Sequence, residues 1–341
     1  MTLRITWARA AAAVVALILA GLLFAWSGLF NVAASSGHWK ATEWFLHWVM
    51  RNSVRTHAAF ATPDEVTTRE GLVSAAGHFA GACASCHGAP GQRPLPVMQK
   101  AMPPAPDLSV NAREWTDRQT FWILKHGVKY SGMPAWAAKE RPDEIRRMVA
   151  FVRRLPEMTP AEYRSLAGEA GQVGRLNACV ACHGADGRGR GQPDIPVLGG
   201  QSPAYLARTL ADYAAGRRDS AVMAQAAALL TPEERVALAK HFAAMPGLGR
   251  GTAVDDARAQ DIAERGLPRV QLPACLSCHK PGGSAPVLTG QKPQYLAARL
   301  RHWKGDGKEI DARQPQDVMP VISRRIPDDM IDRLSRYLAG R

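Results

Sequence analysis

Cysteine is scarce in this 341-residue chain and is confined to one kind of site. All six cysteines lie in three C-x-x-C-H pentapeptides, as the pairs Cys83 and Cys86, Cys179 and Cys182, and Cys275 and Cys278. No cysteine is left over, and structural disulfides would not require a histidine after every second cysteine. Strand-type alternation is also rare, and the periodic stretches are rich in Ala, Leu, Arg and Glu. The sequence therefore predicts an all-α fold.

Charge of one sign is nowhere concentrated. The formal net charge is +13 and the pI is about 9.8, but basic and acidic residues are mixed along the chain. No segment has the composition of a nucleic-acid-binding arm, so we expect no nucleic-acid partner. A basic surface favours brief docking with acidic protein partners.

Only one long hydrophobic run is present, from Ala10 to Trp26, and Arg4 and Arg9 precede it. Its length of about 20 residues suits a membrane-spanning helix, and the arginines place the N-terminus in the cytoplasm. Cleavage of a signal peptide near Val32 is the alternative. We assign residues 1–35 to a membrane anchor or signal segment, with the following domains in the periplasm at the inner (cytoplasmic) membrane.

Residues 36–68 form a linker with an unusual cluster of aromatic side chains. Trp39, Trp44, Phe45 and Trp48 crowd one short amphipathic stretch with basic residues around them. Such a helix suits the membrane interface. Packing against the next domain or a partner subunit is the other interpretation.

One plan then repeats three times, over residues 69–157, 158–250 and 251–341. Each unit has a helical lead-in, a C-x-x-C-H, a Gly/Pro-rich loop, a middle helix, a methionine and a closing helix. The last two units share the pattern G-Q-x-P-x-Y-L-A-x-x-L. In the second closing helix, Thr231 and Glu234 predict a capping box with Pro232 at the first helical position.

The C-x-x-C-H spacing predicts covalent attachment of a c-type haem. Two thiols three residues apart on a helical turn can reach the two vinyl groups of a rigid ring. The adjacent histidine then offers its imidazole to the iron. A zinc site would need two such pairs close in space, and a thioredoxin-type motif would not repeat. We therefore expect three haem c groups with proximal ligands His87, His183 and His279.

Methionine is the usual sixth ligand of electron-transfer cytochromes c, because a thioether stabilises ferrous iron. Met133, Met223 and Met319 follow the middle helix and precede the closing helix in their respective units, so we expect them to be the distal ligands in loops. The alternatives are His126, Met102, His241, His302 and Met330. Tyr205 and Tyr295, with Arg208 and Arg299 one helical turn on, are candidates for binding haem propionates.

These motifs make residues 69–341 resemble class I cytochromes c. Units two and three resemble the tandem di-haem cytochrome c4 pattern, including G-Q-x-x-x-Y-L and the methionine before the last helix. The resemblance implies three tandem class I domains behind a transmembrane helix. The anchor and three domains together also resemble cytochrome subunits of periplasmic alcohol and aldehyde dehydrogenases.

The implied function is electron transfer rather than catalysis. Donors would be a periplasmic or membrane dehydrogenase or quinol, and acceptors an oxidase or a soluble cytochrome. The alternatives are a di-haem peroxidase-like enzyme, which needs an open sixth site, and a dedicated dehydrogenase subunit.

Overall fold

The computed structural model describes residues 6–168, 175–280, 283–305 and 318–341, so Arg4 lies outside the described residues. Within these ranges the secondary structure is helical, and pairing of extended backbone is limited to isolated bridges. This confirms the all-α prediction. The α-helices are α1 Trp7–Trp26, α2 Lys40–Ala61, α3 Leu72–Ala82, α4 Ala84–His87, α5 Leu108–Asn111, α6 Asp117–His126, α7 Pro142–Arg154, α8 Pro160–Ala167, α9 Arg175–His183, α10 Pro203–Ala214, α11 Ala221–Ala228, α12 Pro232–Ala243, α13 Ala257–Arg265, α14 Cys275–Cys278, α15 Pro293–Lys304, α16 Val318–Arg324 and α17 Ile331–Gly340.

The first domain is built around α3 and α7, which pack against each other. Its core contains the fully buried rings of Phe79, Phe121 and Phe151. Helix α7 is locally well specified, because Pro142 occupies its first turn together with acidic residues, and basic residues occupy its last turn.

The predicted boundary between residues 157 and 158 separates α8 from the domain against which it packs. Tyr163 and Ala167 of α8 lie in the core of the first domain, and α8 packs on α3. Leu155 at the predicted boundary is also buried in that core. The packing therefore places α8 with the first domain rather than with the second.

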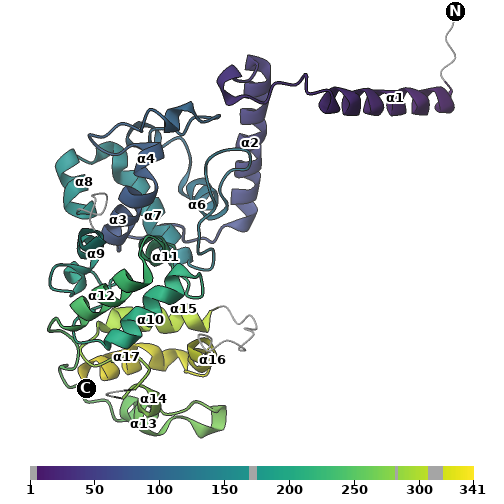
Figure 1. The fold of residues 1–341 in the computed structure, drawn as a ribbon. Helices are drawn as coiled ribbons and strands as arrows, with labels where there is room; N and C mark the ends of the chain where they lie inside the picture. The colour runs from purple at the N-terminus through teal and green to yellow at the C-terminus, as the bar shows by residue number, and fades with distance from the viewer. Residues whose placement is uncertain (1–5, 169–174, 281–282, 306–317) are drawn as a thin grey trace, which may run out of the picture.

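The second and third domains face each other through the motif that they share. Val197 donates its backbone N–H to Gln291 Oε1 at 3.0 Å, and Gln291 Nε2 donates back to the Val197 carbonyl at 3.0 Å. Gln201 forms the matching pair with the N–H and carbonyl of Val287 at 3.0 and 3.2 Å. Each shared glutamine thus binds the other domain's loop, and the interface is reciprocal. Figure 1 shows the helices of these two domains, coloured from teal to yellow, in the lower part of the molecule.

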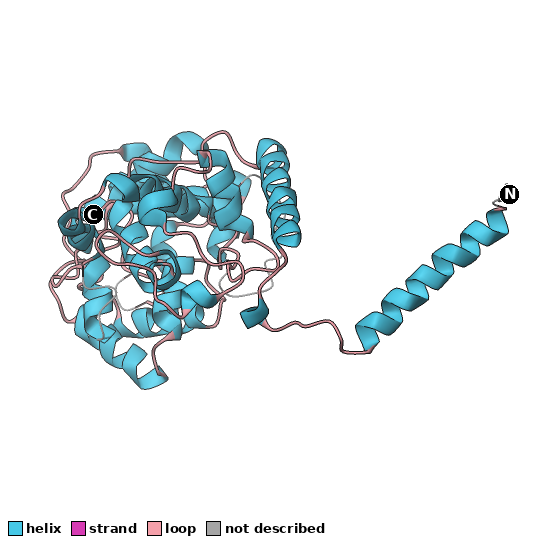
Figure 2. Cartoon of the chain, turned by 90° about the horizontal axis from the view of Figure 1, so that it is seen from above, coloured by secondary structure: helices cyan, strands magenta, loops and turns pink. Residues whose placement is uncertain are grey.

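Of the two N-terminal helices, only α1 stands apart from the haem-motif domains. Helix α1 projects away from the rest of the chain (Figure 2), and none of its residues is buried. Helix α2 packs on α6 through its C-terminal half, where Val54 and Ala58 are 2% exposed. Trp44 and Trp48 in its N-terminal half are 67% and 52% exposed and stack on each other.

Candidate haem sites

Each C-x-x-C-H motif forms the helical turn that its spacing predicts. In the first motif, the His87 N–H donates to the Cys83 carbonyl at 2.9 Å, and in the third the His279 N–H donates to the Cys275 carbonyl at 3.0 Å. The second motif lies in the last turns of α9. The six thiols form no disulfide. Each turn therefore brings two thiols and one imidazole to neighbouring positions.

The chain after the first two motifs must turn sharply. Gly88 has a φ of +67°, and a Cβ there would lie 2.9 Å from Pro94 Cδ. Gly184 has a φ of +76° at the matching place. The left-handed conformation and the close contact explain glycine after each of these two histidines. The third motif has Lys280 here, so its post-motif loop differs from the other two.

The histidine rings are oriented by backbone carbonyls. Nδ1 of His87 lies 2.9 Å from the Pro106 carbonyl, and Nδ1 of His279 lies 2.9 Å from the Pro286 carbonyl. A carbonyl only accepts, so Nδ1 must carry the proton in each pair. Burial lowers the pKa of both imidazoles, which keeps them neutral, although the prolyl carbonyls oppose this shift. The lone pair then resides on Nε2, the atom that a haem iron requires.

His183 in the second domain is the most buried of the three histidines, at 8% exposure. Burial lowers its pKa to about 4, while the Pro196 carbonyl acts in the opposite direction. Nδ1 of His183 has no hydrogen-bond partner among the described residues. The carbonyls of Pro106 and Pro286, which hold the other two histidines, were missed by the sequence analysis, because they follow their histidines by 19 and 7 residues, which is no common spacing.

Burial also governs the chemistry of the thiols. It raises the pKa of Cys83 to about 12 and those of Cys182 and Cys275 to about 11. Zinc binding and dithiol redox chemistry both use the thiolate, which these surroundings disfavour. No three metal-binding side chains of the His, Cys, Asp or Glu type converge within the described ranges. Neutral thiols beside an apolar interior suit thioether attachment of an apolar ring.

The apolar cores touch the first cysteine of each motif. Cys83 and Met133 both pack at the edge of the first core, and Cys275 and Met319 both pack at the edge of the third. Among the described residues, the second core is a smaller cluster of three buried side chains, Leu206, Ala239 and Phe242, with Cys179 at its edge.

In the first and third motifs, the second cysteine has more polar surroundings than the first. The Cys86 N–H donates to the Cys83 carbonyl at 3.1 Å, so Cys86 belongs to the predicted turn. Its thiol is only partly buried, lies outside the first apolar core and is contacted by Ser85 Oγ at 3.9 Å. Cys278 in the third motif is exposed. The second motif differs, because Cys179 and Cys182 are both partly buried. The haem-binding roles of all six cysteines stay predictions: Cys83, Cys86, Cys179, Cys182, Cys275 and Cys278.

The expectation that all three methionines lie in loops is wrong for two of them. Met133 lies in the loop between α6 and α7, whereas Met223 lies in the first turn of α11 and Met319 near the start of α16. Met223 is also absent from the second apolar core, where Met245, which the sequence analysis did not consider, packs beside Phe242. The distal-ligand roles of Met133, Met223 and Met319 therefore stay predictions.

The alternative ligands occupy varied positions. Met330 is fully buried in the third core, and His241 is exposed beside Phe242. The His126 ring lies 5.0 Å from the Trp122 ring in a tilted arrangement, and a Cβ at Gly37 would lie 3.7 Å from Met102 Cε. A position within a helix does not distinguish these alternative ligands from the predicted distal methionines, because Met223 and Met319 also lie in helices. His302 lies in α15 near two arginines, and burial followed by those arginines lowers its pKa to about 4.

A basic cluster of the buried Arg299 and the half-buried Arg218 lies where the second and third domains meet. Arg218 donates to Tyr205 Oη at 3.1 Å and stacks on the Tyr213 ring at 5.0 Å. Arg299 stacks on Trp303 at 4.7 Å and is 8% exposed. Within the described residues neither arginine forms an ion pair, and Arg299 Nε has no hydrogen-bond partner. Burial and neighbouring arginines lower the Arg299 pKa.

Buried guanidinium groups without carboxylate partners are costly. Haem propionates would supply the missing carboxylates, so this cluster fits the group that the motifs imply. The predicted propionate role of Arg208 has less support, since Arg208 is exposed and donates to the Ser284 carbonyl at 2.7 Å. Arg218 is the better candidate for this propionate role. The sequence analysis did not consider it, because it does not follow Tyr205 or Tyr295 by one helical turn.

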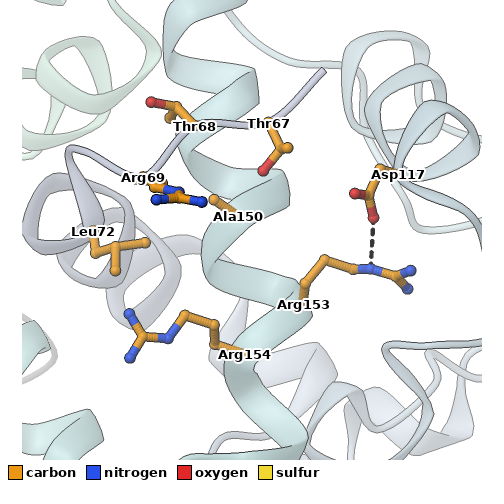
Figure 3. Close-up of a pocket in the computed structure, with 8 residues that line it drawn as sticks. All are labelled: Thr67, Thr68, Arg69, Leu72, Asp117, Ala150, Arg153 and Arg154. Atoms are coloured by element: carbon orange, nitrogen blue, oxygen red, sulfur yellow. Dashed lines mark ion pairs between the residues drawn. The ribbon is translucent and has the colours of Figure 1, made fainter. Parts of the chain in front are cut away.

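An open cavity of about 460 Å³ in the first domain lies apart from these motifs (Figure 3). Arg153 Nε pairs with Asp117 Oδ1 at 2.6 Å on one side, and Arg69 and Arg154 line the other. None of the predicted haem-binding side chains lines it. This basic hollow is therefore not a haem site.

Comparison with known proteins places the first two motifs in two family models. Residues 72–152 match the model described as cytochrome c oxidase, cbb3-type, subunit III, and residues 169–264 match the cytochrome c model. About half of the chain also matches curated proteins. The thiosulfate dehydrogenase electron acceptor of Stutzerimonas stutzeri is 36% identical over 173 residues, which cover 48% of this chain and 78% of that protein.

Two further matches each cover about half of the chain. Cytochrome c4 of Thiocapsa roseopersicina is 31% identical, over 50% of this chain and 91% of that protein. Among solved structures, a thiosulfate dehydrogenase from Marichromatium purpuratum is 34% identical over 52% of this chain and 39% of that chain, with a TM-score of 0.42.

Proposed function

Because the chain belongs to the class I cytochrome c family, and its relatives carry electrons between dehydrogenases and acceptors, we propose that it carries one haem c in each of its three domains and passes electrons along them. The observation that best supports this proposal is the repeated helical turn in which two cysteine thiols lie next to a neutral histidine imidazole. His87 and His279 are held by a prolyl carbonyl on Nδ1. Haem c, when bound, supplies an iron that cycles between two oxidation states.

Residues of the chain would set the reduction potential of each iron and keep substrates away from it. His87, His183 and His279, together with Met133, Met223 and Met319, would hold the iron of each haem, which would leave no open site for a substrate and favours a carrier over a peroxidase-like enzyme. Arg218 and Arg299 would pair with haem propionates between the second and third domains, which the reciprocal glutamine contacts join.

The donor that we propose is a periplasmic dehydrogenase, with a thiosulfate-oxidising enzyme first to be tested because two relatives are electron acceptors of such enzymes. The acceptor is an oxidase or a soluble cytochrome. Stopped-flow mixing of the oxidised protein with a reduced thiosulfate dehydrogenase tests the donor. Reduction at a rate no faster than that of an unrelated mono-haem cytochrome c control would contradict it.

The proposed location is the periplasmic face of the inner membrane. Helix α1 has 20 residues with a mean hydropathy of 2.2 and no buried position, so its length and composition suffice to cross a bilayer. The exposed tryptophans Trp44 and Trp48 of α2 would then lie at headgroup depth. Fractionation of cells, with the mass of the mature chain, distinguishes an anchored from a cleaved N-terminus.

The haem number is tested by intact mass under denaturing conditions together with a pyridine haemochrome ratio. We expect three haems that survive denaturation. The double variant Cys275→Ser/Cys278→Ser should retain two, and an exposed-site Ser277→Ala control should retain three. Two haems in the unaltered protein would refute the proposal as stated. Carbon monoxide that binds rapidly to one reduced haem would instead favour the peroxidase-like alternative.

A further inference from the structure

The segment that carries Met223 is held by the first domain and not only by its own. Ser220 caps α11, because its Oγ accepts the Met223 N–H at 3.1 Å. The same hydroxyl donates to Glu144 Oε1 at 2.6 Å, and Glu144 lies on α7 of the first domain. Glu144 Oε2 accepts the Ala221 N–H at 2.9 Å. One carboxylate therefore binds both the cap and the first residue of α11.

The residues next to these contacts strengthen the attachment. Arg141 of the first domain donates from Nη1 to the Asp219 carbonyl at 2.9 Å and lies 3.0 Å from Glu144 Oε1. Ala221 is 2% exposed and packs within the apolar core of the first domain. Three consecutive residues, 219–221, are thus bound by the first domain. Met223 follows two residues later.

Because Glu144 is buried, water could not easily take over the hydrogen bonds of its carboxylate. Its side chain is 3% exposed, and that of Arg141 is 10% exposed. Trp136 Nε1 makes a further contact to Glu144 Oε2 at 3.4 Å. A carboxylate at the first turn of a helix is also favoured by the exposed N–H groups there. Without it, the Ala221 N–H would be buried without an acceptor. Arg141 would lose one of its two carboxylate partners and keep only Asp143, which it contacts at 2.8 Å.

The methionine loop of the first domain is different. The Met133 N–H is bound by Ser131 Oγ at 3.2 Å, and the Met133 carbonyl accepts the Val128 N–H at 3.1 Å. Both contacts lie within the first domain. Met133 is thus held locally, whereas Met223 depends on a neighbour.

We propose that Glu144 is a positioning residue for the distal methionine of the second haem. By fixing the first turn of α11, it keeps the Met223 thioether in place, so that docking of the first domain governs the ligation of a haem that this domain does not carry. This inference rests on the proposed ligand role of Met223.

The test compares Glu144→Gln with Glu140→Gln, which removes an exposed carboxylate close by in the chain. Glutamine keeps the shape but cannot accept from all the donors that surround Glu144. In the fully haem-loaded protein, Glu144→Gln should weaken the binding of Met223 to the iron of the second haem by roughly 10- to 100-fold. Carbon monoxide should then bind one reduced haem faster by that factor. That haem alone should also lose the charge-transfer absorption of methionine-ligated ferric haem and fall in potential.

Three results can overturn or separate the claims. If Glu144→Gln matches Glu140→Gln in carbon monoxide binding and in all three potentials, and only unfolds more easily, Glu144 is merely structural and the inference fails. If Ser220→Ala speeds carbon monoxide binding as much in the Glu144→Gln variant as it does alone, Glu144 does not act on Met223 through the Ser220 cap. That result also refutes the inference. If Met223→Leu leaves all methionine-ligated signals intact while Met245→Leu removes one, the ligand assignment itself is wrong.

Discussion

Removing one of the two reciprocal glutamines should open the interface between the second and third domains by a predictable amount. Gln291→Ala deletes both hydrogen bonds to Val197, and Gln291 and Val197 are 7% and 8% exposed. Two buried backbone groups would lose their partners, each at a cost of about 1–3 kcal/mol. With partial replacement by water, we expect the closed interface to lose about 2–4 kcal/mol.

Gln201→Ala is the matched variant on the other side of the interface. Its partner Val287 is only half-buried, so water can reach the freed N–H and carbonyl more easily. We expect a smaller loss of about 1–2 kcal/mol. Gln260→Ala, at an exposed position of α13, is the control and should have no effect on the interface.

The assay is amide hydrogen exchange in the haem-loaded protein, read at the Val197 and Val287 N–H groups. Because about 1.4 kcal/mol corresponds to a tenfold change, the Val197 amide should exchange roughly 30- to 1000-fold faster in Gln291→Ala. Global unfolding would speed exchange everywhere, so the amides of the first-domain core serve as internal reference. Equal protection of Val197 in Gln291→Ala and in the Gln260→Ala control would refute the reasoning.

Three further predictions concern other parts of the chain. Hydrogen bonds from Arg333 lower the pKa of Asp256 to about 2, so the cap of α13 should stabilise the third domain above about pH 4 and be lost as pH falls through about 2; Asp256→Asn should abolish this acid dependence in unfolding titrations. Arg299→Leu should lower the potential of an adjacent haem in a redox titration, because a buried cation favours the reduced form, whereas Arg301→Leu should not. Trp44→Ser/Trp48→Ser should reduce quenching of tryptophan fluorescence by brominated lipids in nanodiscs, and unchanged quenching would exclude the interfacial position.

Local chemistry explains which features could be predicted from the sequence. Spacing alone predicts the helical turn of each C-x-x-C-H motif, and the Thr231–Glu234 capping box is present with Pro232 in the first turn of α12. These features depend on residues at most four apart. Their geometry is set by the backbone before any tertiary contact forms.

Features that depend on distant residues could not be predicted in this way. The prolyl carbonyls that orient the histidines follow at unequal intervals, and Leu155 resembles a linker residue until the core of the first domain is seen around it. The different surroundings of Cys83 and Cys86 are likewise set by the core that packs on one of them. The contact between Glu144 and Ser220 joins residues 76 positions apart. A glutamate in the first turn of α7 is adequately explained by the helix dipole, so nothing local indicates its second role.

The two domain interfaces differ in kind, and this difference governs how the haems are coupled. The contact between the second and third domains is made by side chains that bind backbone groups: the two shared glutamines, and Lys292 Nζ, which donates to the Gln192 and Ile195 carbonyls at 2.6 and 2.8 Å. The contact of the first domain uses charge: Glu144 and Arg141 bind the start of α11, and Asp194 accepts from Ser74 at 2.6 Å with Arg147 at 3.7 Å. A buried charge left without its partner costs far more than a lost amide contact. The first domain should therefore dock fully or not at all, and in docking it should set the position of Met223.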